Sequence, residues 1–414
     1  MLSAKAGFGE AAWLMRFEKV YTPYGGYWST PFCRWQGSFG HLHSLKFAAE
    51  VGARALSERE ISPEVLDGLY LGLTVPQQSS FYGAPWIAGM IGAPGITGPT
   101  ISQACATSAK VIMAAAAEIE LGTHSAILAV LCDRTSNSPH IYYPNPLGTG
   151  GIGDREDWVW DNFGHDPYAQ NPMIQTAENT AKRAGVDRAA QDETMLLRCR
   201  QYQDALKDDS AFLKRFMVSP IAVKDSTGRK VMATVTGDEG VFPTTAEGLA
   251  KLKPIMEGGT VTYGTQTYPA DGNAGVIVTT REKAAELSRD RSVSVRIVSY
   301  GQGRADKGFM PMANVPASRQ ALERAGITIR DVTAIKTHNP FAVNDVYFAK
   351  TMGVELSAMN RFGSSLVWGH PQAPTGTRLI IELIEELAVA GGGYGLFTGC
   401  AAGDTALAVV VRVD

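Results

Sequence analysis

Two cysteines and two histidines stand in sequence settings that suit a nucleophile and deliberately positioned polar side chains. Cys105 directly precedes a strongly helical run rich in Ala and Ile, and the N-terminus of a helix favours thiolate over thiol. Cys400 lies in a Gly-flanked loop that enters a C-terminal apolar strand, where backbone can approach a ligand closely. His338 ends a predicted strand, and His370 stands between a glycine and a proline just before a helix. The thiolate is the nucleophilic form of cysteine, so Cys105 is a candidate nucleophile.

Each of these residues also has a structural interpretation. A cysteine taken alone is more often a small buried core residue than a nucleophile. A histidine at a turn can serve as a polar group that holds the turn. The positions of the four residues relative to one another therefore decide between catalysis and structure.

The elements that must position these residues form two similar halves. Two pairs of segments repeat at nearly the same offset: 55–69 with 321–335, and 108–133 with 376–400. The second pair consists in both cases of a helical pattern, a Gly turn and an apolar strand. We expect an internal duplication, in which Cys105 and His370 occupy equivalent helix starts that pseudo-twofold packing brings together.

Strand patterns alternate with amphipathic helices in both halves, which predicts a layered α/β fold. The clearest strand patterns cover residues 69–74, 126–132, 293–299 and 406–413. Between the halves, residues 135–258 begin with a stretch rich in Pro, Gly and aromatic residues and continue into a cationic helical stretch. We expect this segment to be an insertion that covers one half.

Composition excludes several classes of protein. The chain has 414 residues, 45% hydrophobic and 19% charged, which is an ordinary globular composition for two or three packed units. A net charge of -3 provides no general attraction for nucleic acid or an anionic membrane. No apolar run is long enough to span a membrane, and Glu10 interrupts the N-terminal apolar stretch, so we expect a cytoplasmic protein. Five scattered cysteines without CxxC favour neither a disulfide framework nor a zinc finger.

Four loops resemble, in chain order, the four catalytic loops of the thiolase family. They are Cys105-Ala106-Thr107-Ser108, His338-Asn339-Pro340-Phe341, Gly369-His370-Pro371 and Cys400-Ala401-Ala402-Gly403. Asn360 precedes His370 as the family's Asn does. The resemblance runs nearly the full length, since residues 20–26, 176–193 and 249–275 are similar to the family's first strand and turn, loop-domain helix and returning segment.

The resemblance implies a fold and an assembly. The fold is a duplicated α/β core of two βαβαβαββ halves in five layers, with an inserted loop domain. The implied N-terminal half comprises residues 1–134 and 259–283, and the C-terminal half comprises 284–414. Residues 135–258 would form the loop domain, with roles in CoA binding and oligomer contacts. A homodimer or homotetramer follows, and a small accessory protein is a further candidate partner.

The resemblance also implies an acyl-CoA C-acyltransferase that cleaves a 3-oxoacyl-CoA with CoA, or runs the reverse Claisen condensation, through an acyl-cysteine. Cys105 would carry the acyl group and His370 would be its base. Cys400 would be the acid/base at the α-carbon. His338, with His370, would donate to the enolate oxygen, and the backbone N–H groups of Cys105 and Ala402 would form a second oxyanion hole. No metal and no permanently bound cofactor are required, since CoA is a substrate.

Contacts to CoA follow from the same resemblance. Thr267 retains the hydroxyl of a Ser that contacts CoA in relatives. The cations Arg183, Lys214 and Arg215 in the insertion are candidates for its phosphates.

Three positions depart from the family pattern. Asn339 replaces the acid of the His-Asp-x-Phe loop of the sterol-carrier-type and archaeal branches. Ala402 stands where a Gly is usual, and Thr107 where a small residue is usual. A backbone N–H survives replacement of Gly by Ala when φ is negative, so Ala402 is compatible with activity.

Two other functions stay open. A condensing enzyme of the ketosynthase or chalcone-synthase type shares the duplicated core but lacks the second cysteine, which makes Cys400 the discriminating residue. The other is a non-enzymatic subunit that binds acyl-CoA in a complex with a small accessory protein. The glycine pattern at 148–153 lacks the strand-to-helix context of a dinucleotide site.

Aromatic residues suggest a bulky or aromatic acyl group. They gather in the insertion and in the segment 81–86: Tyr142, Tyr143, Trp158, Trp160, Phe163, Tyr168, Phe81, Tyr82 and Trp86.

Overall fold

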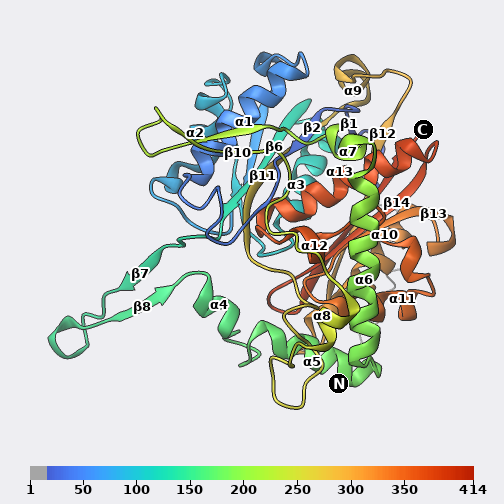
Figure 1. The fold of residues 1–414 in the computed structure, drawn as a ribbon. Coiled ribbons are helices and arrows are strands. Elements are labelled where there is room, and N and C mark those ends of the chain that lie inside the picture. Colours follow the sequence, from blue (N-terminus) through green and yellow to red (C-terminus); the bar gives the residue numbers. More distant parts are fainter. Residues whose placement is uncertain (1–15) are drawn as a thin grey trace, which may run out of the picture.

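A single mixed sheet runs through both halves of the chain in the computed structural model, which describes residues 16–414 (Figure 1). Its strand order is β13-β14-β15-β12-β1-β11-β6-β4-β5, and β2 and β3 also pair with β11. The strands of the first half are β1 (Tyr21–Thr22), β2 (Tyr27–Ser29), β3 (Cys33–Arg34), β4 (Gly68–Gly72), β5 (Thr100–Ile101), β6 (Ala126–Arg134) and β11 (Ala270–Thr279). Those of the second half are β12 (Val295–Arg304), β13 (Val332–His338), β14 (Gly393–Ala401) and β15 (Thr405–Val413).

The four strand patterns seen in the sequence correspond to β4, β6, β12 and β15. β6 and β15 are apolar along nearly their whole length because helices cover both faces of the sheet. Residues 1–15, which contain most of the stretch where we expected no secretory segment, lie outside the described part of the chain.

Helices form three layers, and the strands of the two halves form one layer on each side of the central helices. α3 (Thr107–Leu121) and α13 (Ala373–Val389) make up the central layer and contact each other. α1 (Ser44–Glu58) and α2 (Gly83–Met90) cover the outer face of the first half, and α10 (Asn314–Ala325) and α11 (Ala342–Met352) cover that of the second (Figure 1). α13 is buried on every side from Ala373 to Leu387, as a central helix must be. The expected five-layer α/β core is therefore confirmed.

The starts of α3 and α13 meet at the centre of the molecule. Ser108 Oγ donates to the carbonyl oxygen of Ala373, and Thr377 N donates to Ser108 Oγ at 2.7 Å. A Cβ on Gly376 would lie only 2.9 Å from the Cβ of Ser108, so glycine permits this close approach. The two equivalent helix starts are brought together as the duplication predicted.

The insertion lies against both halves instead of covering one, and it sends out a long arm (Figure 1). Its helices are α4 (Trp160–Gly164), α5 (Met173–Ala184), α6 (Arg188–Ala205), α7 (Lys207–Lys214) and α8 (Ala246–Ala250). Its strands are β7 (His140–Tyr143), β8 (Asp154–Asp157), β9 (Ile221–Lys224) and β10 (Val231–Val235). The arm is the β7–β8 hairpin, whose tip holds the glycine pattern 148–153, away from any strand-to-helix turn.

Two short helices complete the fold, α9 (Arg281–Leu287) and α12 (Ser365–Trp368). Within residues 16–414, no helix has both the length and the apolarity that a membrane crossing requires.

Candidate active site

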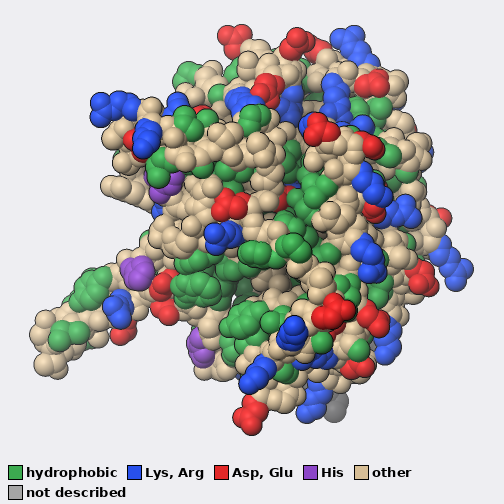
Figure 2. Space-filling model, in the orientation of Figure 1, with side chains coloured by type: hydrophobic (Ala, Val, Ile, Leu, Met, Phe, Trp, Pro, Cys, Tyr) green, Lys and Arg blue, Asp and Glu red, His purple; other side chains and the backbone are tan. Residues whose placement is uncertain are grey.

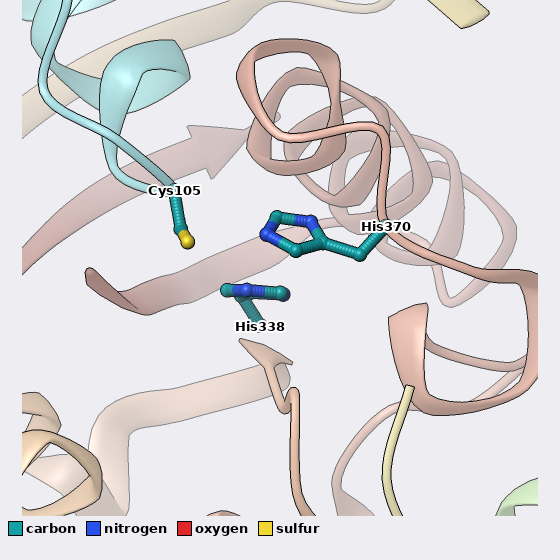
Figure 3. A group of neighbouring side chains, drawn as sticks. All are labelled: Cys105, His338 and His370. Carbon is teal, nitrogen blue, oxygen red and sulfur yellow. The ribbon is translucent and has the colours of Figure 1, made fainter. Parts of the chain in front are cut away.

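Cys105, His338 and His370 point toward one another from three different elements (Figure 3). The Cys105 sulfur and one nitrogen of each ring lie within 4.8 Å of one another. The two imidazole rings are tilted by 37° with centroids 4.1 Å apart. A thiol and two imidazoles therefore share one small space.

Cys105 occupies the loop just before α3, after Ala104, whose φ is +43°. Its thiol donates to Oε1 of Gln372 at 3.2 Å. Burial raises the pKa of the Cys105 thiol to about 12, although the N–H groups of Ala402 and of Cys105 itself act in the opposite direction. The thiolate that we expected from the helix start is therefore not the resting form, because desolvation outweighs the helix and the two N–H groups.

His370 follows Gly369, whose φ of +92° turns the chain from α12 toward α13. A Cβ on Gly369 would lie 2.7 Å from the ring of Tyr268, so only glycine fits here. The ring Nδ1 of His370 pairs with Thr375 Oγ1 at 2.7 Å, while Nε2 has no partner among the described residues. Burial lowers the pKa of His370 well below its usual value, so the ring is neutral.

His338 ends β13 and is fully buried. Its Nδ1 pairs with Ser365 Oγ at 2.8 Å, and its Nε2 also lacks a partner among the described residues. Burial lowers the pKa of His338 to about 3. Both rings thus present an uncharged, unpartnered Nε2 to the space beside Cys105.

A buried network holds the His338 loop. Asn339 Nδ2 donates to Asp345 at 2.6 Å, and Asn360 Nδ2 donates to the same carboxylate at 3.1 Å. Arg198 of α6 donates to Asp345 at 2.8 Å, and both side chains are fully buried. The amide that replaces the family's acid is therefore a donor to Asp345, and the insertion is tied to the His338 loop through one ion pair.

Cys400 lies near the end of β14 and is fully buried. Asn344 Nδ2 donates to the Cys400 sulfur at 3.2 Å. Burial raises the pKa of Cys400, the nearby Cys105 raises it further, and the Asn344 hydrogen bond acts in the opposite direction. Cys400 is thus a neutral thiol that can donate a proton.

Asp133, the acid at the end of β6, joins the two halves beside Cys105. Its carboxylate accepts from Thr74 N at 2.9 Å, Val75 N at 2.8 Å and Ala373 N at 2.8 Å, and also from the Thr74 hydroxyl. Burial raises the pKa of Asp133 to about 7 despite these hydrogen bonds. The acid fixes the end of β4 against the start of α13.

A cavity of about 910 Å³ opens onto Cys105, His370 and Gln372. Figure 2 shows hydrophobic side chains gathered around the hollowed centre of this face, near the base of the arm. Ala402 and Thr267 line the cavity, and the Thr267 hydroxyl donates to the carbonyl oxygen of Ser365 at 2.6 Å.

The aromatic residues noted in the sequence divide into two groups. Trp158, Trp160, Phe163 and Tyr168 line the cavity. The others lie outside its lining: Phe81, Tyr82, Trp86, Tyr142 and Tyr143.

The three cations expected near CoA are held elsewhere. Arg183 pairs with Asp306 at 2.7 Å, and Lys214 pairs with Asp209. Arg215 pairs with Glu385 at 2.6 Å on the far side of the core. None of the three lines the cavity.

Three residues near the site were missed in the sequence. Gln372 directly follows the Gly-His-Pro loop, and Asp133 ends a predicted strand, so both positions offered a local signal. Asn344 offered none, because only the packing of α11 against β14 brings it to Cys400.

Comparisons with known proteins agree with this geometry. The family model described as thiolase, N-terminal domain, matches residues 27–282, and the one described as thiolase, C-terminal domain, matches residues 291–413. The human mitochondrial 3-ketoacyl-CoA thiolase is 28% identical over 389 residues, which cover 92% of this chain and 96% of the relative. The beta-ketothiolase BktB of Cupriavidus necator is 29% identical and covers 90% of this chain and 95% of its own length.

Solved structures show the same likeness. A crystal structure of the human mitochondrial 3-ketoacyl-CoA thiolase in complex with CoA superposes with a TM-score of 0.86 at 27% identity, over 97% of this chain and 99% of that one. The acetyl-CoA acetyltransferase of Bacillus anthracis superposes with a TM-score of 0.88 at 27% identity, over 96% and 100% of the two chains.

Proposed function

Because the chain belongs to the thiolase family, we propose that it is an acyl-CoA C-acyltransferase, which cleaves a 3-oxoacyl-CoA with CoA or runs the reverse condensation. The observation that carries the proposal is the meeting of one thiol with two neutral imidazoles, whose Nε2 atoms have no partner among the described residues, beside a large apolar cavity. Nucleophilic acyl transfer needs this combination of a nucleophile, a base and donors to an oxyanion.

The first step would be attack of the Cys105 sulfur on the C3 carbonyl carbon. His370 can take the thiol proton at Nε2, because its Nδ1 is free to donate to Thr375. A thiol with a pKa of about 12 is protonated before attack, so its proton leaves as the carbon–sulfur bond forms. The N–H groups of Cys105 and Ala402, which approach the sulfur, are placed to bind the oxyanion.

The second step would break the bond between C2 and C3. The electron pair passes to the enolate of an acyl-CoA, whose α-carbon takes a proton from Cys400. The Ser365 hydroxyl lies 2.8 Å from His338 Nδ1 and 3.1 Å from Asn339 Oδ1, and Asn339 Oδ1 also accepts the N–H of Leu366. His338 can donate from Nε2 to the enolate oxygen when the Ser365 hydroxyl turns from Asn339 to donate to His338 Nδ1. The thiol of CoA then gives its proton to the Cys400 thiolate and attacks the acyl-cysteine. The bond between the acyl group and Cys105 breaks, the Cys105 sulfur regains its proton from His370, and the new thioester leaves.

CoA is the second substrate in this proposal. Arg304 and Lys307 lie over the ring of Tyr168, at 5.3 Å and 5.0 Å from its centroid, and 62% of the Tyr168 surface is exposed. These cations can attract the phosphates of CoA at the cavity mouth, with Thr267 farther in. We also propose that residues 135–258 form a loop domain that covers this site.

The decisive experiment combines mass spectrometry with thiolysis kinetics. Incubation of the wild type with acetyl-CoA should add one acetyl group to Cys105, and acetoacetyl-CoA should be cleaved when CoA is present. Cys105→Ala should lose both, whereas Cys400→Ala should keep the adduct and lose cleavage. A wild type that is not acylated on Cys105 would refute the catalytic proposal and favour an acyl-CoA-binding subunit.

Cys400 distinguishes thiolase from a condensing enzyme of the ketosynthase type. The fully buried sulfur with its own amide donor favours the thiolase reaction, which uses a second thiol. Full thiolysis activity in Cys400→Ala would contradict that role.

We also propose a homodimer or homotetramer, with a small accessory protein as a further candidate partner. β5 lies at the sheet edge, and Phe81 and Tyr82 beside it are 95% and 68% exposed. Leu147 at the tip of the arm is 97% exposed. Light scattering should give a dimer or tetramer mass, and a monomer at micromolar concentration would contradict this part of the proposal.

A further inference from the structure

The cavity has a mouth and a closed end. At the mouth, Tyr168 and Tyr263 line it with 62% and 73% of their surfaces exposed. At the other end, Val75 and Val159 line it and are only 2% and 3% exposed. Val75 and Val159 are therefore shielded from solvent, and we call the part of the cavity that they line with Thr74 and Trp158 its closed end.

The closed end is fixed directly beside the reacting thiol. Trp158 donates its indole N–H to the carbonyl oxygen of Thr74 at 2.8 Å. Asp133 holds the backbone of Thr74 and, through Ala373, the start of α13 that follows Gln372. One chain of hydrogen bonds thus sets the distance between the Trp158 ring and Cys105.

The aromatic walls offer ring surface and little hydrogen bonding. Trp158 donates its N–H to a backbone carbonyl oxygen, and Tyr268 donates its hydroxyl to the carbonyl oxygen of Val367 at 3.2 Å, so neither polar group is free for a ligand. Phe341 and Met310 add apolar surface. A ring packed against such walls gains both apolar burial and aromatic contact.

Charge also restricts what can bind. Among the described residues that line the cavity, none is a lysine or an arginine. The carboxyl group of Asp166 also lines the cavity and accepts hydrogen bonds from the N–H groups of Tyr168 and Ala169. A carboxyl group of this kind cannot form an ion pair with an anionic ligand. A carboxylate on the acyl group would lose its hydration without a partner, which is costly.

The volume exceeds what a short acyl group requires. About 300–1,000 Å³ encloses drug-sized ligands, and this cavity of about 910 Å³ is near the upper end of that range. In the proposed function the pantetheine arm of CoA would take part of this volume, entering past Tyr168 and Thr267 toward Cys105. An acetoacetyl group would leave the closed end at Trp158 unfilled.

We propose that the acyl group of the substrate carries an uncharged aromatic ring, which the closed end formed by Thr74, Val75, Trp158 and Val159 receives. This inference rests on the proposed thiolase function and names its substrate class. For 3-oxo-3-phenylpropanoyl-CoA, the sulfur of Cys105 bonds to C3 and the C2–C3 bond breaks. The acetyl-CoA enolate that forms takes one proton, and the benzoyl group then passes from Cys105 to CoA.

The test compares thiolysis of 3-oxo-3-phenylpropanoyl-CoA with that of acetoacetyl-CoA. The wild type should show a kcat/KM about 10- to 100-fold higher for the phenyl substrate, the factor expected for burial of one ring. Trp158→Ala should remove most of this preference, measured as the ratio of the two kcat/KM values in the same variant. Trp86→Ala, on an outer helix away from the cavity, is the matched control and should keep the preference.

The outcomes separate this inference from the proposed function. Cleavage of acetoacetyl-CoA with an equal or higher kcat/KM would overturn the aromatic assignment and leave the thiolase function standing. An unchanged preference in Trp158→Ala, with the folded state verified by circular dichroism, would overturn the role of the closed end. Failure of both substrates, with neither acetyl-CoA nor benzoyl-CoA acylating Cys105, would overturn the proposed function itself.

Discussion

The contact between Gln372 and Cys105 predicts how fast the resting thiol reacts. Gln372 Oε1 accepts from the Cys105 thiol and therefore stabilises the protonated form. In Gln372→Met the acceptor is lost, while length and the absence of branching at Cβ are retained. The backbone φ of +63° at position 372 strains glutamine and methionine equally, so the comparison isolates the effect of the side chain. We expect Cys105 in Gln372→Met to react faster with iodoacetamide.

The size of the effect follows from one hydrogen bond. A neutral hydrogen bond contributes about 1 kcal/mol, which corresponds to about 0.7 units in the pKa of Cys105. The thiolate fraction at pH 8 then rises about 5-fold. Because nucleophilicity falls as the thiol pKa falls, the alkylation rate constant should rise about 2-fold. Gln372→Glu should act in the opposite direction and slow alkylation about 10-fold or more, since a carboxylate repels the thiolate.

The assay is quantitative mass spectrometry of the Cys105 peptide during alkylation at several pH values. Gln320→Met on the outer helix α10 is the matched control and should leave the rate unchanged. A slower reaction in Gln372→Met would refute the reasoning, because it would show that the amide donates through Nε2 and stabilises the thiolate. Equal rates in the Met and Glu variants would also refute it.

Three further predictions concern the groups around the site. Arg198→Met leaves Asp345 buried without its cation and should lower the free energy of unfolding by about 3–5 kcal/mol in urea titrations, whereas Arg183→Met, which breaks an exposed pair, should cost less than about 1 kcal/mol. Asn344→Leu removes the donor to the second thiol and raises its pKa, so kcat for thiolysis should fall about 10-fold while acylation by acetyl-CoA proceeds; equal loss of both would contradict the assignment. His338 has a folded pKa of about 3, below the value of about 6.5 in the unfolded chain, so the unfolded chain binds the extra proton and stability falls as pH drops below about 6.5. Between pH 7 and pH 5 this one ring should account for about 2 kcal/mol, which His338→Asn should remove from the pH dependence of the urea midpoint; an unchanged dependence would contradict the assignment.

Much of the fold could be predicted from local patterns. The apolar runs of β6 and β15 and the helical run of α3 are continuous in sequence. Each of these elements buries its apolar side chains only when it lies between two covering layers. The repeat of helix, turn and strand predicted the pairing of α3 with α13, and the structure confirms it through Ser108 and Ala373.

Charge states could not be predicted in the same way. The helix start at Cys105 favours a thiolate, but the buried sulfur has a pKa of about 12. The cations of the insertion were candidates for CoA, but Arg183 and Arg215 are engaged by acids distant in sequence. The pKa of a thiol and the ion pair of a cation both depend on the groups that surround the side chain in space. Those groups can come from any part of the chain.

The sequence by itself determined which residues can do the chemistry and the order in which the chain presents them: Cys105, His338, His370 and Cys400. Only the tertiary structure decided that Gln372 accepts a hydrogen bond from the first thiol, that Asn344 donates one to the second, and that Trp158 lines the cavity. The sequence specifies the chemical type of each side chain, because that type depends only on the residue itself. Their partners lie on other elements, because packing α13 against α3 and α11 against β14 brings together residues that are far apart in the chain.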